Sequence, residues 1–266
     1  MLGAVIGDIA GSRFEFQNRK SKNFELFAPG CRPTDDSIMT LAVAAALLEA
    51  GEDAEALEAC AVEWMQTLGR SYPDSGFGGM FQRWLYSEHP RPYGSYGNGA
   101  AMRISPVGFF ARGEDEVKRL SRAVTAVTHS HPEGLKGAEA TAMAVYLARA
   151  GADMDAIRTR IARDYYQIDF TLDEIRPHYG FDVSCQGSVP QALEAFFEST
   201  SFEDAIRNAV SIGGDSDTIA AIAGGVAEAY YGVPDSLAAA AEGFLDAPLR
   251  EIIGRWQSAM KQRGVT

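Results

Sequence analysis

Two short acidic segments carry the residue types in this sequence that are best suited to chemistry. Residues 34–37 (TDDS) and residues 213–218 (GGDSDT) each precede a helical pattern, and each contains two carboxylates. Four carboxylates brought together would repel one another unless a cation lay among them. Neither segment contains His or Cys, and oxygen ligands suit Mg²⁺ or Mn²⁺ better than zinc. Together the segments predict a site for two metal ions, about 3.5–4 Å apart.

Helix capping alone explains either segment taken singly. Ser, Thr and Asp are the preferred N-cap residues, and acidic side chains suit the positive end of the helix dipole. The second segment offers more than a cap requires, because it has two carboxylates and a double glycine that allows close backbone approach. The pair of segments therefore favours metal binding.

Helical periodicity covers most of the chain and must supply the elements that position these carboxylates. Apolar residues recur at three- and four-residue spacing, whereas strict two-residue alternation is rare. We predict an all-α fold, a single globular multi-helix domain over residues 1–266 that is larger than a four-helix bundle. The predicted helices span residues 36–50, 54–69, 114–128, 133–150, 153–165, 188–198, 201–213, 217–231 and 248–263. Gly- and Pro-rich loops are expected at residues 28–34, 71–79, 88–99 and 176–190.

The helix predicted to follow the second acidic segment has unusually small side chains. Glycine in a helix interior costs about 1 kcal/mol relative to alanine, so paired glycines indicate that neighbouring helices approach closely. We expect a central, buried helix that holds the second segment rigidly. Its small residues are Ala220, Ala221, Ala223, Gly224, Gly225, Ala227 and Ala229.

Composition and charge narrow the class of protein. The 266 residues are 46% hydrophobic and 23% charged, as in ordinary globular proteins, and the formal net charge is −12. This charge argues against a general nucleic-acid binder, although action on a nucleic acid through a small site stays open. Three widely spaced cysteines without a CxxC motif disfavour disulfides and zinc thiolates. Without a signal-like start or a membrane-length apolar run, we expect a cytoplasmic protein, and we expect a monomer.

Several single residues have both a chemical and a structural interpretation. Asp8 lies in a short apolar helix, as an acceptor behind the site or as a buried structural carboxylate. Glu15 lies between two phenylalanines, a setting that can raise a carboxyl pKa and suit an acid or base, and a solvent-exposed loop glutamate is the other interpretation. His129 and His131 are two residues apart, which disfavours a zinc pair on a helix, so one is expected to be structural. Arg103 is expected to form a structural salt bridge, with a carboxylate near the metals as the alternative.

Six motifs in a fixed order resemble those of the ADP-ribosylglycohydrolase family, whose members remove ADP-ribose from modified targets. The resemblance covers nearly the whole chain. The motifs are GAVIGDIAGSRFE (3–15), TDDS (34–37), a glycine loop (75–79), GSYGNGAAMR (94–103), THSHP (128–132) and GGDSDT (213–218). The family has an all-α fold with a central di-metal cleft, so the resemblance implies two Mg²⁺ ions, with Mn²⁺ as a substitute.

The resemblance also implies roles for individual residues. The implied metal ligands are Thr34, Asp35, Asp36, Asp215, Asp217 and Thr218. Glu15 matches a glutamate near the scissile bond, and the catalytic group would be Glu15, Asp35 and Asp36. The implied substrate-binding residues are Gly76, Gly78 and Gly79 at the diphosphate, Gly94, Ser95, Tyr96, Gly97 and Asn98 at the phosphates and distal ribose, and His129 beside the ADP-ribose. The adenine-stacking residue is unassigned, with Tyr93, Phe77 and the 183–189 segment as candidates.

The expected function is metal-dependent hydrolysis of the glycosidic bond between ADP-ribose and a protein arginine. Cleavage would pass through a transition state of oxocarbenium character. Serine-linked, acetyl-linked and nucleobase-linked ADP-ribose remain open as substrates. Two other functions are compatible with the residues: a non-catalytic ADP-ribose-binding module and a Mg²⁺-dependent phosphohydrolase.

Overall fold

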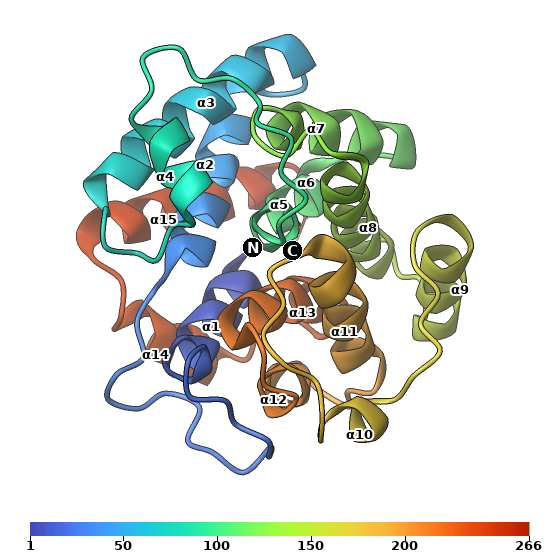
Figure 1. Ribbon diagram of the computed structural model, residues 1–266. Coiled ribbons are helices and arrows are strands. Elements are labelled where there is room, and N and C mark those ends of the chain that lie inside the picture. Colours follow the sequence, from blue (N-terminus) through green and yellow to red (C-terminus); the bar gives the residue numbers. More distant parts are fainter. Residues whose placement is uncertain (266) are drawn as a thin grey trace.

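The computed structural model describes residues 1–265, and within them almost all regular structure is helical (Figure 1). The extended pairing in this range is one antiparallel bridge, between Gly97 and Ser184. The predicted all-α fold is therefore confirmed. The helices are α1 (Leu2–Gly11), η1 (Ser12–Phe14), α2 (Asp35–Ala50), α3 (Ala54–Ser71), α4 (Gly79–Leu85), α5 (Gly99–Met102), α6 (Ser105–Phe110), α7 (Glu114–Ala126), α8 (Pro132–Arg149), α9 (Met154–Asp164), α10 (Leu172–Ile175), α11 (Cys185–Phe197), α12 (Phe202–Ser211), α13 (Ser216–Tyr231), α14 (Asp235–Glu242) and α15 (Ala247–Gln262).

Every helix predicted from periodicity is present, with ends within three residues of the prediction. The largest shift is at α11, which begins at Cys185 inside a stretch predicted as a loop. Ser184 caps it by accepting a hydrogen bond from the Gly187 N–H at 3.1 Å, and Pro190 is accommodated within the helix. The periodicity missed α4, α5, α6, α10 and α14, because four to eight residues hold too few apolar repeats to define a period.

Helix α13 lies at the centre and packs against α1, α8, α11 and α12 (Figure 1). Its residues from Ser216 to Ala227 are all buried, as is the whole of α1. The predicted central, small-sided helix is therefore confirmed.

Close contact between α1 and α13 depends on glycines spaced four residues apart. A Cβ atom built at Gly7 would lie 2.0 Å from the Ala220 carbonyl oxygen, and one at Gly3 would lie 2.3 Å from the Gly224 carbonyl oxygen. Gly11 meets Ser216 in the same way, at 2.5 Å. No side chain fits at these crossings, so the glycines fix both the distance and the register of the two helices. This register aligns the end of α1 with the start of α13.

Helices α2, α3, α7 and α8 complete the packing on the other side of the core. Helix α2 contacts α1, α3 and α15, while α8 contacts α6, α7 and α13. The middle of α2, from Asp36 to Leu47, is buried throughout. No helix of residues 1–265 combines the length and apolar character that a membrane crossing requires.

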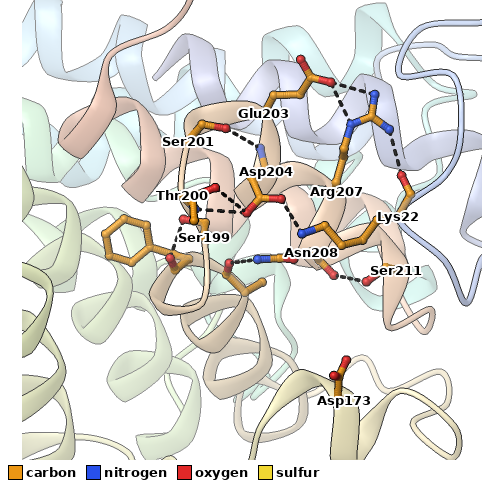
Figure 2. Close-up of polar contacts among 12 residues, drawn as sticks. Lys22, Asp173, Ser199, Thr200, Ser201, Glu203, Asp204, Arg207, Asn208 and Ser211 are labelled. Carbon is orange, nitrogen blue, oxygen red and sulfur yellow. Dashed lines mark hydrogen bonds and ion pairs between the residues drawn. The ribbon is translucent and has the colours of Figure 1, made fainter.

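A long segment without α-helix joins α1 to α2 and is fastened to α12 (Figure 2). The Arg207 guanidinium donates to the carbonyl oxygens of Lys22, at 2.9 Å, and Phe24, at 2.7 Å. The Lys22 ammonium pairs with Asp204 in the first turn of α12. Ser201 caps the same turn by accepting from the Asp204 N–H at 3.1 Å. These contacts hold the segment against α12 at Lys22 and Phe24.

Candidate active site

Carboxylates from α1, α2 and α13 meet at one end of a cavity. Asp8, Asp36 and Asp217 each offer a ligand atom within 4.8 Å of the others. Glu15, Asp215 and Asp217 form a second group of the same kind. Asp217 belongs to both groups, so the two groups adjoin. Two overlapping sets of oxygen atoms are the donor arrangement expected for a pair of divalent ions.

Asp8 holds the N-terminus of α2. Its carboxylate accepts hydrogen bonds from the backbone N–H groups of Thr34, at 2.8 Å, and Ser37, at 3.0 Å. It also accepts from the Thr34 hydroxyl at 2.6 Å and from the Ser37 hydroxyl. Asp8 is therefore an acceptor that positions the first acidic segment. It is also a member of the set formed with Asp36 and Asp217. The Thr34 hydroxyl in turn accepts from the Asp36 N–H at 3.3 Å, as an N-cap does.

Asp36 and Asp217 are buried members of the cluster, with exposed fractions of 2% and 3%. One Asp36 oxygen accepts from the Thr218 hydroxyl at 3.2 Å, and the other has no hydrogen-bond partner within residues 1–265. Burial and the neighbouring carboxylates, Asp8 first for Asp36, raise the pKa of Asp36 well above its usual value. Burial, followed by the charge of Asp36, does the same to the pKa of Asp217. A bound cation would lower both pKa values again, because its positive charge favours the ionised carboxylates.

Glu15 and Asp35 also line the cavity and are less buried than Asp36 and Asp217. Burial and the charge of Asp215 raise the pKa of Glu15 to about 7. Burial and the charges of Asp8 and Asp215 raise the pKa of Asp35 to about 8. A carboxyl group with a pKa near neutrality can both hold and release a proton, which is what general acid–base chemistry requires.

The cavity beside these carboxylates has a volume of about 610 Å³. This is within the range of small-molecule sites. Thirteen of the sixteen residues predicted for the site line it: Glu15, Asp35, Asp36, Gly76, Gly78, Gly79, Ser95, Gly97, Asn98, His129, Asp215, Asp217 and Thr218. Thr34, Gly94 and Tyr96 are not among the lining residues; Thr34 is buried behind them, and the Tyr96 ring packs on His131 at 5.2 Å.

Two glycine turns shape the backbone around the carboxylates. Gly213 and Gly214 both have positive φ angles, of 71° and 77°, and a Cβ atom at Gly214 would lie 2.4 Å from the Tyr179 ring. The positive φ angles and the close approach of Tyr179 therefore both require glycine at these positions. Gly76, with a φ of 106°, follows Ser75, whose carbonyl oxygen accepts from the Asp35 N–H at 2.9 Å. The glycine loop is thus tied directly to the first acidic segment.

Asn98 connects the third loop to the metal-ligand candidates. Its side-chain amide donates to Asp215 at 2.7 Å and to the Ser188 hydroxyl at 3.0 Å. The Asn98 backbone N–H donates to the Val183 carbonyl oxygen at 2.7 Å. The loop at 94–98 is therefore held between α13 and the segment that precedes α11.

Arg103 forms no salt bridge within residues 1–265, so that expectation was wrong. Arg103 is 1% exposed, and it contacts the Thr128 hydroxyl at 2.6 Å, His129 Nδ1 at 3.4 Å and the face of the Phe81 ring, whose centroid is 5.6 Å away. The sequence favoured an ion pair because a buried guanidinium ordinarily has a carboxylate partner. His131 is structural, as one of the two histidines was expected to be, because its Nδ1 accepts from the Glu133 N–H and caps α8.

Aromatic and apolar side chains form the exposed rim of the cavity. Phe16 is 80% exposed and stacks on Phe181, with ring centroids 6.0 Å apart and an interplanar angle of 28°. Of the adenine-stacking candidates, Tyr93 and Val183 line the cavity, whereas Phe77 packs against Phe81 and is not among the lining residues. The adenine partner therefore remains unassigned.

Sequence reasoning gave no role to part of the cavity wall. These residues lie within or beside predicted motifs, or in the loop around residue 181, so proximity to a motif was the one available signal. They are Met39, Met80, Phe81, Arg83, Gly99, Met102 and Phe181.

Comparison with known proteins agrees with this architecture. The family model for ADP-ribosylglycohydrolase matches residues 1–263. The human protein ADP-ribosylhydrolase ARH3 is 26% identical, over 92% of this chain and 88% of its own. ADP-ribosyl-[dinitrogen reductase] glycohydrolase of Rhodospirillum rubrum is 27% identical over 88% and 85%, and ADP-ribosylarginine hydrolase Tri1 of Pseudomonas putida strain GB-1 is 27% identical over 88% and 70%.

The fold is also found among solved structures. One, an ADP-ribosylglycohydrolase-related protein complex, superposes with a TM-score of 0.59 at 24% identity and covers 91% of this chain and 95% of its own. The chain therefore belongs to the ADP-ribosylglycohydrolase family, as the motifs indicated. It is a hydrolase that acts on ADP-ribose linkages.

Proposed function

We propose that this chain is a Mg²⁺-dependent hydrolase with a two-ion site, which cleaves the glycosidic bond between ADP-ribose and an arginine side chain of a modified protein. Mn²⁺ would substitute for Mg²⁺. The single observation that carries the proposal is the pair of overlapping carboxylate groups that share Asp217. Six buried or half-buried carboxylates lie in one place, and the charge of Arg32 near Glu15 offsets their repulsion only in part. They are a strong electrostatic cost unless cations are present.

The donor set fits hard divalent ions. The candidate ligands are carboxylate and hydroxyl oxygens of Asp35, Asp36, Asp215, Asp217 and Thr218, with Thr34 behind them. The Asp36 oxygen that lacks a hydrogen-bond partner within residues 1–265 is an available donor in the interior. When bound, the two ions would neutralise these carboxylates and supply electrophilic contacts to the ribose hydroxyls.

Glu15 is the residue suited to proton transfer. Its carboxyl group lines the cavity within reach of Asp215 and Asp217, and its pKa of about 7 allows both protonation states near neutral pH. It would orient the attacking water and accept its proton as the bond to the target breaks. Asp35 and Asp36 complete the proposed catalytic group by holding the ribose side of the bond.

The loops opposite the carboxylates would bind the rest of the substrate. Backbone N–H groups at Gly76, Gly78 and Gly79 are the proposed partners of the diphosphate, since amide-lined turns bind phosphate oxygens. The 94–98 loop would contact the phosphates and distal ribose through Ser95, Gly97 and Asn98. Gly94 and Tyr96, which do not line the cavity, would take part only by shaping this loop.

The rim favours a planar cationic target group. Phe16 directly follows Glu15, and its partner Phe181 lines the same cavity as Glu15, so the stacked pair lies beside the acidic end. An aromatic face next to a carboxylate suits a guanidinium group through cation–π and charge attraction. The name of the Pseudomonas putida relative agrees with an arginine linkage, while human ARH3 is similar to nearly the same degree. The linkage that this chain cleaves is therefore to be identified with a panel of ADP-ribose conjugates.

The test is release of free ADP-ribose from ADP-ribosyl-arginine, ADP-ribosyl-serine, O-acetyl-ADP-ribose and ADP-ribosylated DNA, each in Mg²⁺ and in EDTA. We expect Mg²⁺-dependent release that is fastest from the arginine conjugate. Release that is faster from another conjugate would overturn the arginine assignment. Release that persists in EDTA would overturn the metal requirement. ADP-ribose binding without turnover would instead support a binding module, and phosphate release would support a phosphohydrolase.

A further inference from the structure

His129 lies in the cavity wall with its two ring nitrogens in different surroundings. The side chain is 4% exposed and lines the cavity. The Nε2 edge faces residues 97–99, because Cβ atoms built at Gly99 and Gly97 would lie 3.4 Å and 3.7 Å from Nε2. The Nδ1 edge faces inward, toward Thr128 and Arg103.

The contacts at Nδ1 determine where the imidazole proton lies. The Arg103 guanidinium, which has only donors, donates to the Thr128 hydroxyl at 2.6 Å. That hydroxyl lies 2.7 Å from His129 Nδ1, and its other acceptor, the Thr125 carbonyl oxygen, is farther away at 3.5 Å. The Thr128 hydrogen therefore points at Nδ1. Arg103 presents a second donor 3.4 Å from the same nitrogen, so Nδ1 must accept and Nε2 must carry the proton.

The same surroundings keep the ring uncharged. Burial, followed by the charge of Arg103, lowers the pKa of His129 well below its usual value. Tyr93, with its ring centroid 6.1 Å away, is the other titratable group against the ring, and burial raises its pKa to about 12. Both neighbours therefore keep their protonation states across the neutral range. A neutral imidazole with a defined tautomer has one donor to offer the cavity.

We propose that Arg103 and Thr128 act as positioning residues that fix His129 in the Nε2–H tautomer, so that it donates to a phosphate or ribose oxygen of the substrate and does not act as an acid or base. The substrate half of this inference rests on the proposed function, whereas the tautomer does not. This positioning role also accounts for a buried arginine whose hydrogen-bond partners are a hydroxyl and an imidazole.

The first test is long-range ¹H–¹⁵N correlation NMR of the full chain near pH 7. The chain has four histidines, so single His→Gln variants assign every ring, and the exposed His89 and His178 serve as references. We expect the nitrogen shifts of the Nε2–H tautomer for His129 in the wild type. An Nδ1–H pattern, or an imidazolium at this pH, would overturn the proposal. In Thr128→Val we expect the Nδ1–H form to become populated, while Thr128→Ser retains the wild-type pattern.

The second test measures the Kd of ADP-ribose by calorimetry in the same variants. We expect Thr128→Val to raise Kd about 10-fold, as loss of one oriented hydrogen bond would, and Thr128→Ser to stay near wild type. Equal Kd values for both variants would contradict the substrate role. If Thr128→Val does not fold, the wild-type spectrum still decides the tautomer. A wild type that shows the Nε2–H form but releases no ADP-ribose from any conjugate would refute the proposed function and leave the tautomer assignment intact.

Discussion

The acidic end of the cavity and its rim are built in opposite ways. Most carboxylates at the acidic end come from α1 and from the N-termini of α2 and α13 and are buried, while Glu15 follows η1 and joins the acidic end to the rim. The rim is built from loops and short helices around residues 14–18, 76–83, 93–98 and 179–184, and it exposes Phe16, Met80, Phe181 and Val183. Rigid helices suit groups whose distances must be fixed, while loops suit contacts that differ between substrates. We therefore propose that the acidic end carries out the chemistry and that the rim selects the target.

Removing the carboxylate shared by both groups should have the largest effect. Because Asp217 belongs to each donor set, Asp217→Asn is expected to lower kcat/KM more than about 100-fold in Mg²⁺. Asp169→Asn, a change at an exposed loop position, is the matched control and should retain wild-type rates. An Asp217→Asn enzyme with normal activity would refute the assignment of the acidic end to catalysis.

The close approach of α1 to α13 can be tested by a substitution that adds one methyl group at their crossing. Gly7→Ala places a Cβ atom against the Ala220 carbonyl oxygen and should destabilise the fold by about 3 kcal/mol, measured by denaturant unfolding. Gly254 of α15 has nothing within 4 Å of the same built atom, so Gly254→Ala should be neutral or stabilising by about 1 kcal/mol. Equal effects of the two changes would show that the helices do not approach as described.

Mg²⁺ should stabilise the protein more as the pH rises. Without metal, the folded-state pKa values of Glu15, about 7, and Asp35, about 8, exceed the unfolded values near 4. The folded protein then binds more protons than the unfolded chain between these limits, so its stability falls as pH rises through this window. Metal replaces those protons, and at 100 times its Kd it adds about 2.7 kcal/mol.

Thermal unfolding at pH 5 and pH 8 checks this linkage, with NaCl at matched ionic strength as the control. The increase in Tm on adding Mg²⁺ should be small at pH 5 and several degrees at pH 8. The same increase at both pH values would mean that the bound ion does not compete with protons for these carboxylates.

Changes at the rim should alter substrate choice, and their effect on kcat/KM should be smaller than that of Asp217→Asn. Phe16→Ala is expected to lower kcat/KM for ADP-ribosyl-arginine about 5-fold, as loss of a cation–π contact of about 1 kcal/mol would, and to leave the Kd of free ADP-ribose unchanged. Tyr86→Ala, an exposed aromatic that is not among the cavity-lining residues, is the control. A weaker Kd for ADP-ribose in Phe16→Ala would place the ring beside the adenosine rather than the target.

Local patterns in the sequence were sufficient for the long helices and for the two acidic segments, whereas the family resemblance supplied the loop residues of the candidate site. Periodicity located the long helices, and the two acidic segments with their double glycine identified residues that converge in space. The sequence left two roles open for Asp8, and it could not decide between them because the contacts with Thr34 and Ser37 join residues 26 and 29 positions apart. The contacts of Arg103 with Thr128 and His129 could not be predicted, because they join residues 25 and 26 positions apart. Phe181 lies in a segment without periodicity, so only tertiary structure places it at the rim.

The number of divalent ions bound per chain tests the central claim most directly. Titration of the metal-free protein with Mn²⁺, followed by electron paramagnetic resonance of the free ion, should give two sites in the wild type. Loss of the shared carboxylate in Asp217→Asn should weaken both sites. A wild-type stoichiometry of one or none, in protein that is folded and binds ADP-ribose, would contradict the two-ion account.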